Sequence, residues 1–334
     1  MSVSDKPVLL SLVVPAFNEE DVIDLFYART IPAVSAVSES FEIIFINDGS
    51  TDATADKIKK LHETDPRIKL IDLSRNFGKE IAMTAGLDLS CGDVVVVMDV
   101  DLQDPPELIP EMVKKWREGY DTVYATRKVR EGESFIKKTT ANLFYRLIRR
   151  ITKINIPANT GDFRLMSRRT VDALKLLREH HRFMKGVFSW VGFRQTQIYY
   201  QREPRAAGTT KWNYWKLWNF ALEGITSFTY GPLKLSSYLG FFAALLAFCY
   251  ALFLTVRTLI FGIDVPGYAS IMVVVLFFSG VQLVFLGILG EYVGRMFNET
   301  KKRPLYLIQD LVGVDQVNDK VFLDKKVRKD MHDV

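Results

Sequence analysis

Two long stretches near the C-terminus contain no charged residue, and they limit the fold of this 334-residue chain more than any other feature. They run from Leu235 to Val256 and from Val265 to Gly290. Each exceeds the roughly 20 residues that an α-helix needs to cross the hydrocarbon core of a bilayer. Core helices of soluble proteins are seldom so uniformly apolar. The pattern predicts a transmembrane hairpin within residues 233–294, with helices at about 235–257 and 269–291.

The basic residues around this hairpin predict its orientation. Lysines at 211, 216 and 234 precede it, Arg295 and residues 301–303 follow it, and the link between the spans has Arg257 as its one basic residue. The positive-inside rule then places both termini in the cytoplasm and makes residues 295–334 a cytoplasmic tail. Pro15 and the acidic residues after it interrupt the apolar N-terminal run, so no signal peptide is expected.

The first 125 residues alternate between short apolar runs and longer mixed segments. The runs predict strands, the segments between them predict helices, and alternation at this spacing is typical of βαβ units. We therefore expect an α/β domain with a mainly parallel sheet in residues 1–211. The predicted strands are 8–14, 41–46, 68–73, 94–98 and 121–125, and beyond them the pattern predicts helices from 168 and at 183–190 and a strand at 194–201.

The run from Val94 to Met98 ends abruptly in acidic residues. Asp99 and Asp101 are two apart, so in an extended chain they would point the same way. Paired carboxylates with open coordination positions suit Mg²⁺ or Mn²⁺ carrying substrate phosphates. The alternative is a polar turn at the strand end, with Asp104 as a helix cap before Pro105.

Other predicted strands also end in acid or amide groups, which favours the metal site over the turn. Asn18 and Glu19 follow the first strand and Asp48 follows the second. Ends of parallel strands converge at one edge of a sheet, where α/β proteins bind their ligands. The chain has neither G-x-G-x-x-G after the first strand nor G-x-x-x-x-G-K-[ST], so a dinucleotide dehydrogenase and a P-loop NTPase are disfavoured.

Two further segments are predicted to lie on the membrane surface. A basic belt begins at Arg127, and residues 134–153 within it combine lysines and arginines with apolar residues at helical spacing. Residues 212–232 begin with an aromatic-rich stretch just before the hairpin, which is typical of an interfacial helix. A solvated helix face remains the alternative for the belt. Nucleic acid is not expected as a partner, because no nucleic-acid motif accompanies the belt.

Six motifs resemble those of the polyprenyl-phosphate glycosyltransferases, relatives of dolichol-phosphate mannose synthase within the family 2 glycosyltransferases of the GT-A fold. The resemblance covers nearly the whole chain, and it extends to the bacterial bactoprenol glucosyltransferases with a C-terminal membrane hairpin. The motifs are Val14–Glu20, Ile46–Ser50, Leu73–Lys79, Asp99–Pro105, Gly161–Met166 and Lys211-Trp212.

The resemblance implies a role for each candidate site residue in a GT-A catalytic domain. Asp99, Asp101 and Gln103 would bind Mg²⁺ or Mn²⁺, and Asp162, Arg164 and Asp101 would form the reaction centre. Arg127 with Lys137 or Lys138 would hold the acceptor phosphate. The nucleotide and its diphosphate would contact Pro15, Phe17, Glu19, Asp48, Asp99, Arg205 and Lys211.

The implied reaction is inverting transfer of a sugar, glucose in the first instance, from a UDP-sugar to undecaprenyl phosphate. It would occur at the cytoplasmic face of a bacterial inner membrane and serve the modification of cell-surface glycans. Another sugar (N-acetylglucosamine, mannose or an aminoarabinose derivative), a homo-oligomer, and Asp162 as either base or orienting group all stay open.

Two other functions are disfavoured by the sequence. A processive polysaccharide synthase would normally show a Gln-x-x-Arg-Trp motif and several spans, whereas this chain has no such motif and two predicted spans. A non-catalytic membrane scaffold would have no need of Asp99, Asp101, Gln103 and Asp162 together.

Overall fold

The computed structural model describes residues 9–128, 160–201, 229–262 and 267–314. The predicted membrane-surface helix at 134–153 and most of the predicted interfacial segment at 212–232 lie outside these residues, as do Lys137, Lys138, Arg205 and Lys211.

One eight-stranded sheet organises the N-terminal domain, in the order β7-β5-β6-β4-β1-β2-β3-β8. Four of the seven pairings are parallel and three are antiparallel, so the predicted α/β fold is confirmed with a mixed sheet. The strands are β1 (Leu10–Ala16), β2 (Phe41–Asn47), β3 (Ile68–Leu73), β4 (Val94–Val97), β5 (Thr122–Arg127), β6 (Thr160–Ser167), β7 (Gln195–Tyr200) and β8 (Ile308–Val312).

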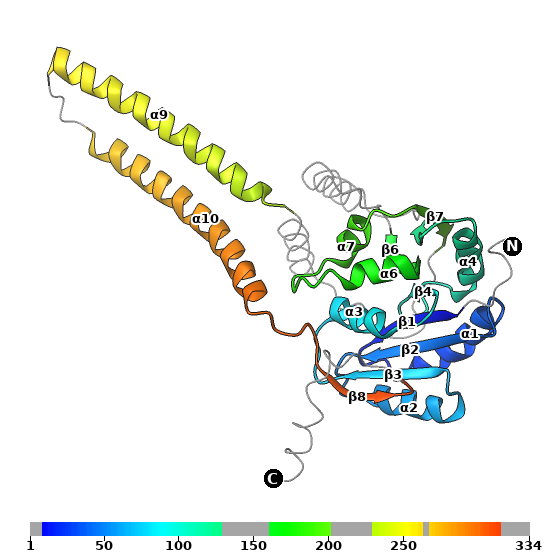
Figure 1. Cartoon of the computed structure of the whole chain (residues 1–334). Helices are drawn as coiled ribbons and strands as arrows, with labels where there is room; N and C mark the ends of the chain where they lie inside the picture. Colours follow the sequence, from blue (N-terminus) through cyan, green and yellow to red (C-terminus); the bar gives the residue numbers. More distant parts are fainter. Residues whose placement is uncertain (1–8, 129–159, 202–228, 263–266, 315–334) are drawn as a thin grey trace, which may run out of the picture.

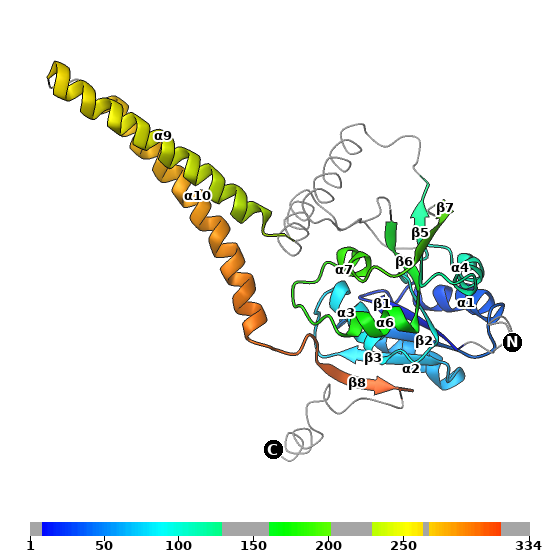
Figure 2. The ribbon, with the colours of Figure 1, turned by 45° about the horizontal axis from the view of Figure 1, so that its top comes forward.

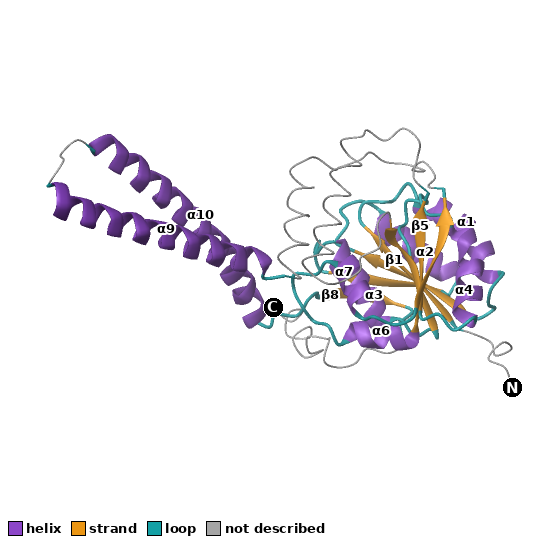
Figure 3. Ribbon diagram, turned by 90° about the horizontal axis from the view of Figure 1, so that it is seen from above, coloured by secondary structure: helices purple, strands orange, loops and turns teal. Residues whose placement is uncertain are grey.

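Helices cover both faces of this sheet (Figure 3). One face carries α1 (Ile23–Ser35), α2 (Thr54–Thr64), the 3₁₀ turn η2 (Pro106–Leu108) and α4 (Ile109–Arg117). The other carries α3 (Lys79–Leu89), α6 (Arg168–Lys175) and α7 (Met184–Trp190). The domain is therefore a three-layer sandwich.

The pleat of the strands divides the apolar residues between two cores. Leu12 and Val14 of β1 face the α1 side, whereas Val13 between them faces the α3 side. Alternate residues of β4 divide in the same way, and all four of its valines are fully buried. Strands covered on both faces read as continuous apolar runs, which is why these strands were predictable from the sequence.

Two strands were not predicted. β6 lies antiparallel between β4 and β5, with Val97 opposite Arg164. Its charged residues, Asp162 and Arg164, prevent the continuous apolar run by which the other buried strands could be recognised. β8 lies in the segment predicted as a tail, and it pairs antiparallel with the edge strand β3. Only five residues long, it carries too little pattern of its own.

Two long helices extend away from the sheet domain (Figures 1 and 2). They are α9 (Gly231–Phe261) and α10 (Tyr268–Thr300), and both are long and apolar enough to cross a membrane. Toward the sheet domain, both helices extend several residues past the uncharged stretches of the sequence. Large apolar side chains such as Phe241 and Leu276 are exposed along them, whereas most of those in the sheet domain are buried.

The base of α10 is joined to the loop between α6 and α7. Glu299 accepts hydrogen bonds from the backbone N–H of His180 at 2.7 Å and pairs with the His180 imidazole at 3.2 Å. Beside this joint, Tyr292 donates a hydrogen bond to the carbonyl of Thr229, at the entry to α9. The end of α10 therefore contacts the sheet domain, and the entry to α9 lies against α10.

Candidate active site

The candidate site lies at the carboxyl edge of the central strands. β1 lies between β2 and β4, so the order of strands reverses at β1. Ligands of open α/β sheets bind at such a switch point. The loops after β1 and β4 meet there, and they hold Phe17, Glu19, Asp99 and Asp101.

The loops after β2 and β3 are fastened together by Asp48. Its two carboxylate oxygens accept the backbone N–H groups of Phe77 at 2.7 Å and Gly78 at 2.9 Å. Gly49 has φ +67°, and a Cβ there would lie 2.4 Å from the backbone of Arg75, so only glycine allows this close crossing. Burial nevertheless raises the pKa of Asp48. Asp48 therefore fixes the loop that leads into α3.

Asp99 and Asp101 do not lie in an extended segment as predicted. β4 ends at Val97 and the chain turns at residues 100–101, with Leu102 at φ 55°. A carboxylate oxygen of Asp101 accepts the backbone N–H of Gln103 at 3.1 Å. The two carboxylates are therefore held by a turn, and the extended-chain argument for their alignment is wrong.

Lys79 links Asp99 to Asp162. Its ammonium lies 2.6 Å from Asp99 Oδ1 and 2.5 Å from Asp162 Oδ2. Because β6 runs antiparallel to β4, the beginning of β6 brings Asp162 to the edge where β4 ends. Burial alone would lower the pKa of Lys79 and raise that of Asp162. The two carboxylates outweigh burial at Lys79 and raise its pKa, and Lys79 outweighs burial at Asp162 and lowers its pKa.

Glu80 and Lys185 surround this ion pair. Burial and then the Asp162 carboxylate raise the pKa of Glu80 to about 8, so Glu80 is mostly protonated at neutral pH. Its carboxyl group accepts the backbone N–H of Met184 at 3.2 Å, which attaches α7 to α3. Burial lowers the pKa of Lys185, and the nearby Asp162 partly offsets this.

Arg164 is held by backbone groups and a ring. Its guanidinium donates to the carbonyls of Gly161 at 3.0 Å and Asp162 at 3.3 Å, and it lies 3.8 Å from the ring centre of Phe188. Burial lowers its pKa to about 10, which leaves it charged at neutral pH. The Asp162 carboxylate accepts a hydrogen bond from Lys79 rather than from Arg164. Backbone carbonyls therefore orient the Arg164 guanidinium.

Arg127 joins Asp104 and Tyr200 in a second cluster. The Arg127 Nε donates to the hydroxyl of Tyr200 at 3.0 Å, and Tyr200 donates to Asp104. Arg127 also lies 3.7 Å from Asp104. Asp104 is therefore no helix cap: Pro105 occupies that position at η2, and no side chain caps it. A Cβ on Gly161 would lie 2.9 Å from Arg127, so the glycine makes room for the guanidinium.

These groups divide the edge into two halves. The acidic half, in the loops after β1, β2 and β4, consists of Glu19, Asp48, Asp99 and Asp101. The cationic half, on β5, β6 and α7, contains Arg127, Arg164 and Lys185, with the carboxylates of Asp104 and Asp162 beside them. Lys79 lies between the halves through its contacts with Asp99 and Asp162.

The acidic half fits a divalent metal ion. Asp99, Asp101 and Gln103 offer hard oxygen atoms, the ligands that Mg²⁺ and Mn²⁺ prefer. A positive charge, the Lys79 ammonium, already contacts Asp99. Among the described residues, no group of three or more His, Cys, Asp or Glu could hold a metal by itself. Two carboxylates would leave positions open for phosphate oxygens and water.

The structure thus brings the described members of the predicted site to one edge. Pro15 is buried at the end of β1, Phe17 is 38% exposed beyond it, and the Glu19 backbone bonds Thr54. Sequence reasoning missed Lys79, Glu80, Lys185 and Tyr200 as members of the site. Lys79 closes the quoted motif 73–79 directly after a strand, and that position was the signal available for it.

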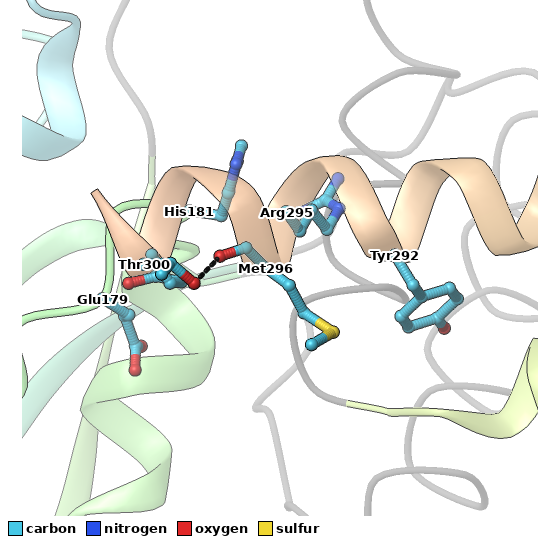
Figure 4. A pocket seen from close by; sticks show the side chains of 7 residues that line it. Glu179, His181, Tyr292, Arg295, Met296 and Thr300 are labelled. Carbon is cyan, nitrogen blue, oxygen red and sulfur yellow. Dashed lines mark hydrogen bonds between the residues drawn. The ribbon is translucent and has the colours of Figure 1, made fainter. Parts of the chain in front are cut away.

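A separate pocket lies at the base of α10 rather than at the sheet edge (Figure 4). Its volume is about 390 Å³. It combines two carboxylates with a histidine, an arginine and apolar groups next to the joint between His180 and Glu299. The lining residues are Glu179, His181, Tyr292, Arg295, Met296, Glu299 and Thr300.

Two family models match the chain. The model for glycosyl transferase family 2 matches residues 11–174, which include β1 to β6 and the edge described above. The model for the GtrB C-terminal hairpin matches residues 231–296, which include α9 and most of α10. The second match indicates that the two apolar helices associate with a membrane.

Relatives match over almost the full length. An uncharacterised glycosyltransferase of Synechocystis is 55% identical over 92% of this chain and 96% of its own. A bactoprenol glucosyl transferase of Shigella phage SfX is 49% identical over 90% of this chain and 98% of its own. Glucosyl-3-phosphoglycerate synthase of Mycobacterium tuberculosis, solved with Mn²⁺, UDP and phosphoglyceric acid, covers 66% of this chain and 76% of its own at 19% identity and a TM-score of 0.46.

Proposed function

Because the chain belongs to the family 2 glycosyltransferases and carries the GtrB type of hairpin, we propose that it transfers glucose from UDP-glucose to a polyprenyl phosphate. It is a membrane-associated transferase. The transferred sugar and the lipid are proposed from the phage relative, whose name gives glucosyl transfer to bactoprenol and which matches nine tenths of this chain.

The observation that carries the proposal is the division of one sheet edge into an acidic and a cationic half. A nucleotide sugar brings a diphosphate that needs a metal ion, and the lipid brings a phosphate that needs cations. The carboxylates of Asp99 and Asp101 suit the first, and the guanidinium of Arg127 suits the second. Both halves lie on the domain to which the membrane helices are attached.

On the donor side, Asp99 and Asp101, with the side-chain oxygen of Gln103, would hold Mg²⁺ or Mn²⁺. When bound, the ion would offset the charge that develops on the departing diphosphate. Arg205 and Lys211 would add cations over the same group. Asp48 would support the nucleotide by fixing the loop before α3, and Phe17 and Pro15 would lie against the base.

On the acceptor side, positioning matters more than deprotonation. A phosphate monoester has its second pKa near 6 and is mostly a dianion at neutral pH. Arg127, with Lys137 or Lys138, would bind this anion and reduce its repulsion from the donor. The low pKa of Asp162 makes it a poor proton acceptor, so we assign Asp162 an orienting role through Lys79. Attack opposite the leaving UDP would invert the anomeric carbon.

We propose that the reaction occurs at the cytoplasmic face of the plasma membrane, with α9 and α10 crossing the bilayer. Cysteines introduced singly at Asp264 and Asp315, in a variant without Cys91 and Cys249, test this orientation. An impermeant thiol reagent applied to intact cells should label the cysteine at 264 and spare that at 315. Equal labelling of both would contradict it.

A donor screen tests the reaction itself. The purified full-length protein is incubated with undecaprenyl phosphate, Mn²⁺ and one nucleotide sugar at a time, and the lipid product is measured. UDP-glucose should give the fastest transfer, and Asp101→Ala should lose most of that activity. Transfer of N-acetylglucosamine or mannose in its place would change the sugar assignment. No release of UDP from any donor would favour a non-catalytic scaffold.

A further inference from the structure

Lys79 occupies an unusual place between the two halves of the edge. Its ammonium contacts one carboxylate of the proposed metal site, Asp99, and one carboxylate of the reaction centre, Asp162. No role in the reaction described above requires this lysine to touch Asp99. The contact therefore calls for an account of its own.

The position of Lys79 is set from the donor side. It is the first residue of α3, and Gly78 before it has φ +95°, a conformation that favours glycine. The backbone N–H groups of Phe77 and Gly78 are bound to Asp48. The lysine is thus anchored to the same loop that Asp48 would hold beneath a nucleotide.

A divalent ion and an ammonium group cannot both stay on one carboxylate oxygen without strong repulsion. Two like charges about 4 Å apart repel appreciably even near a protein surface, and more so for a double charge. Asp162 gives the ammonium a second partner, 2.5 Å away, on which it can remain. The lysine can therefore leave Asp99 without becoming unpaired.

We propose that Lys79 is a positioning residue that makes metal binding conditional on the nucleotide. Without a donor, its ammonium neutralises Asp99 and competes with a free metal ion. The diphosphate brings additional ligands for the metal, which then displaces the ammonium from Asp99 and leaves it on Asp162. This inference rests on the proposed function, because it assumes that Asp99 binds a metal together with a nucleoside diphosphate.

The two possible roles of Lys79 predict opposite changes in metal affinity when the lysine is removed. A permanent structural bridge would keep Asp99 in place, so its removal would weaken metal binding. A competing ammonium would oppose the metal, so its removal would strengthen binding in the absence of nucleotide. The effect of UDP is the ratio of the metal affinity with UDP to the metal affinity without it. If removing the lysine strengthens metal binding without UDP and leaves binding with UDP unchanged, this ratio must fall by the same factor.

The test measures Mn²⁺ binding to the detergent-solubilised full-length protein by electron paramagnetic resonance, with and without UDP. Lys79→Met should bind Mn²⁺ about tenfold more tightly than wild type without UDP, which is the size expected for loss of one charged contact. With UDP the two proteins should differ little. Lys79→Arg keeps the charge and should behave like wild type.

Lys57→Met is the matched control, because it removes an exposed lysine that pairs with Asp24 at 2.8 Å, away from this edge. It should leave both affinities unchanged. Lys79→Gln serves as a second neutral variant if the methionine protein does not fold. Unchanged or weaker Mn²⁺ binding by the neutral variants without UDP would overturn the inference while leaving the proposed function intact. Failure of the wild type to bind Mn²⁺ with UDP would overturn both.

Discussion

The acidic and cationic halves of the sheet edge differ in how their strands reach it. The acidic half follows the ends of β1, β2 and β4. These strands all run in the same direction, because β1 pairs in parallel with both β2 and β4. The cationic half includes β6, which runs the opposite way and places its beginning at the same edge. One antiparallel strand thus sets Asp162 beside Asp99, with Lys79 between them, and Arg164 opposite Val97. The comparison teaches that a single change of strand direction can join a cluster of cationic residues to a cluster of acidic ones.

Removing a carboxylate from the acidic half should have the largest effect. Asp101→Ala should lower kcat by about a hundredfold to a thousandfold, the usual cost of losing charge stabilisation at a leaving group. Excess EDTA should do the same to the wild type, and Mn²⁺ should restore it. Turnover by initial rates of UDP release is the measurement. Full activity in EDTA would remove the metal from the acidic half.

Removing a cation from the cationic half should weaken binding of the lipid acceptor and leave binding of the nucleotide donor unchanged. Arg127→Ala should raise the KM for the lipid phosphate by roughly tenfold to a hundredfold, since a charge-assisted contact contributes about 1.5–3 kcal/mol. UDP affinity with metal should stay within about twofold of wild type.

Arg29→Ala is a suitable control for Arg127→Ala, because it breaks an ion pair with Glu107 away from the edge. It should change neither the lipid KM nor UDP affinity. An equal loss of UDP and lipid affinity in Arg127→Ala would assign Arg127 to the donor diphosphate and erase the proposed division of labour.

A subtler change tests whether Tyr200 aligns Arg127. Tyr200→Phe removes the hydroxyl that accepts from Arg127 and donates to Asp104. It should raise the lipid KM by about threefold to tenfold, which corresponds to a neutral hydrogen bond of about 0.5–1.5 kcal/mol. The kcat at saturating lipid should be nearly unchanged. An effect larger than that of Arg127→Ala would mean that the tyrosine itself contacts the substrate.

A last prediction concerns the stability of the folded protein, rather than substrate binding, at the junction of the halves. The folded-state pKa of Glu80 is about 8, above its ordinary value of 4.5, so the folded protein binds the extra proton between these values. Stability should therefore fall as pH rises through this window, by at most about 1.4 kcal/mol per pH unit. Glu80→Gln should remove that contribution, and its advantage in apparent Tm over wild type should grow from pH 5 to pH 8. Glu118→Gln, which breaks an exposed ion pair with Lys115, is the control variant.

Much of this edge could be predicted from the sequence, for a physical reason. Strands buried on both faces, such as Val94–Val97, are continuous apolar runs, and the polar residues that end them are conspicuous. The contact of Lys79 with Asp162 could not be predicted in this way, because it depends on β6 lying beside β4. The charges of Asp162 and Arg164 hid that strand. Burial within the folded edge, which no linear pattern reveals, also determines the protonation of Glu80.

The pairing of β8 with β3 has a consequence for the synthesis of the chain. β3 is complete by residue 73, but its outer neighbour begins only at residue 308, after both apolar helices. During translation the edge of β3 stays unpaired until both apolar helices have been made, and an open strand edge is a template for aggregation. A soluble fragment that stops before α9 would carry that open edge permanently. A truncated protein meant to isolate the sheet domain should therefore restore residues 305–314 through a short linker.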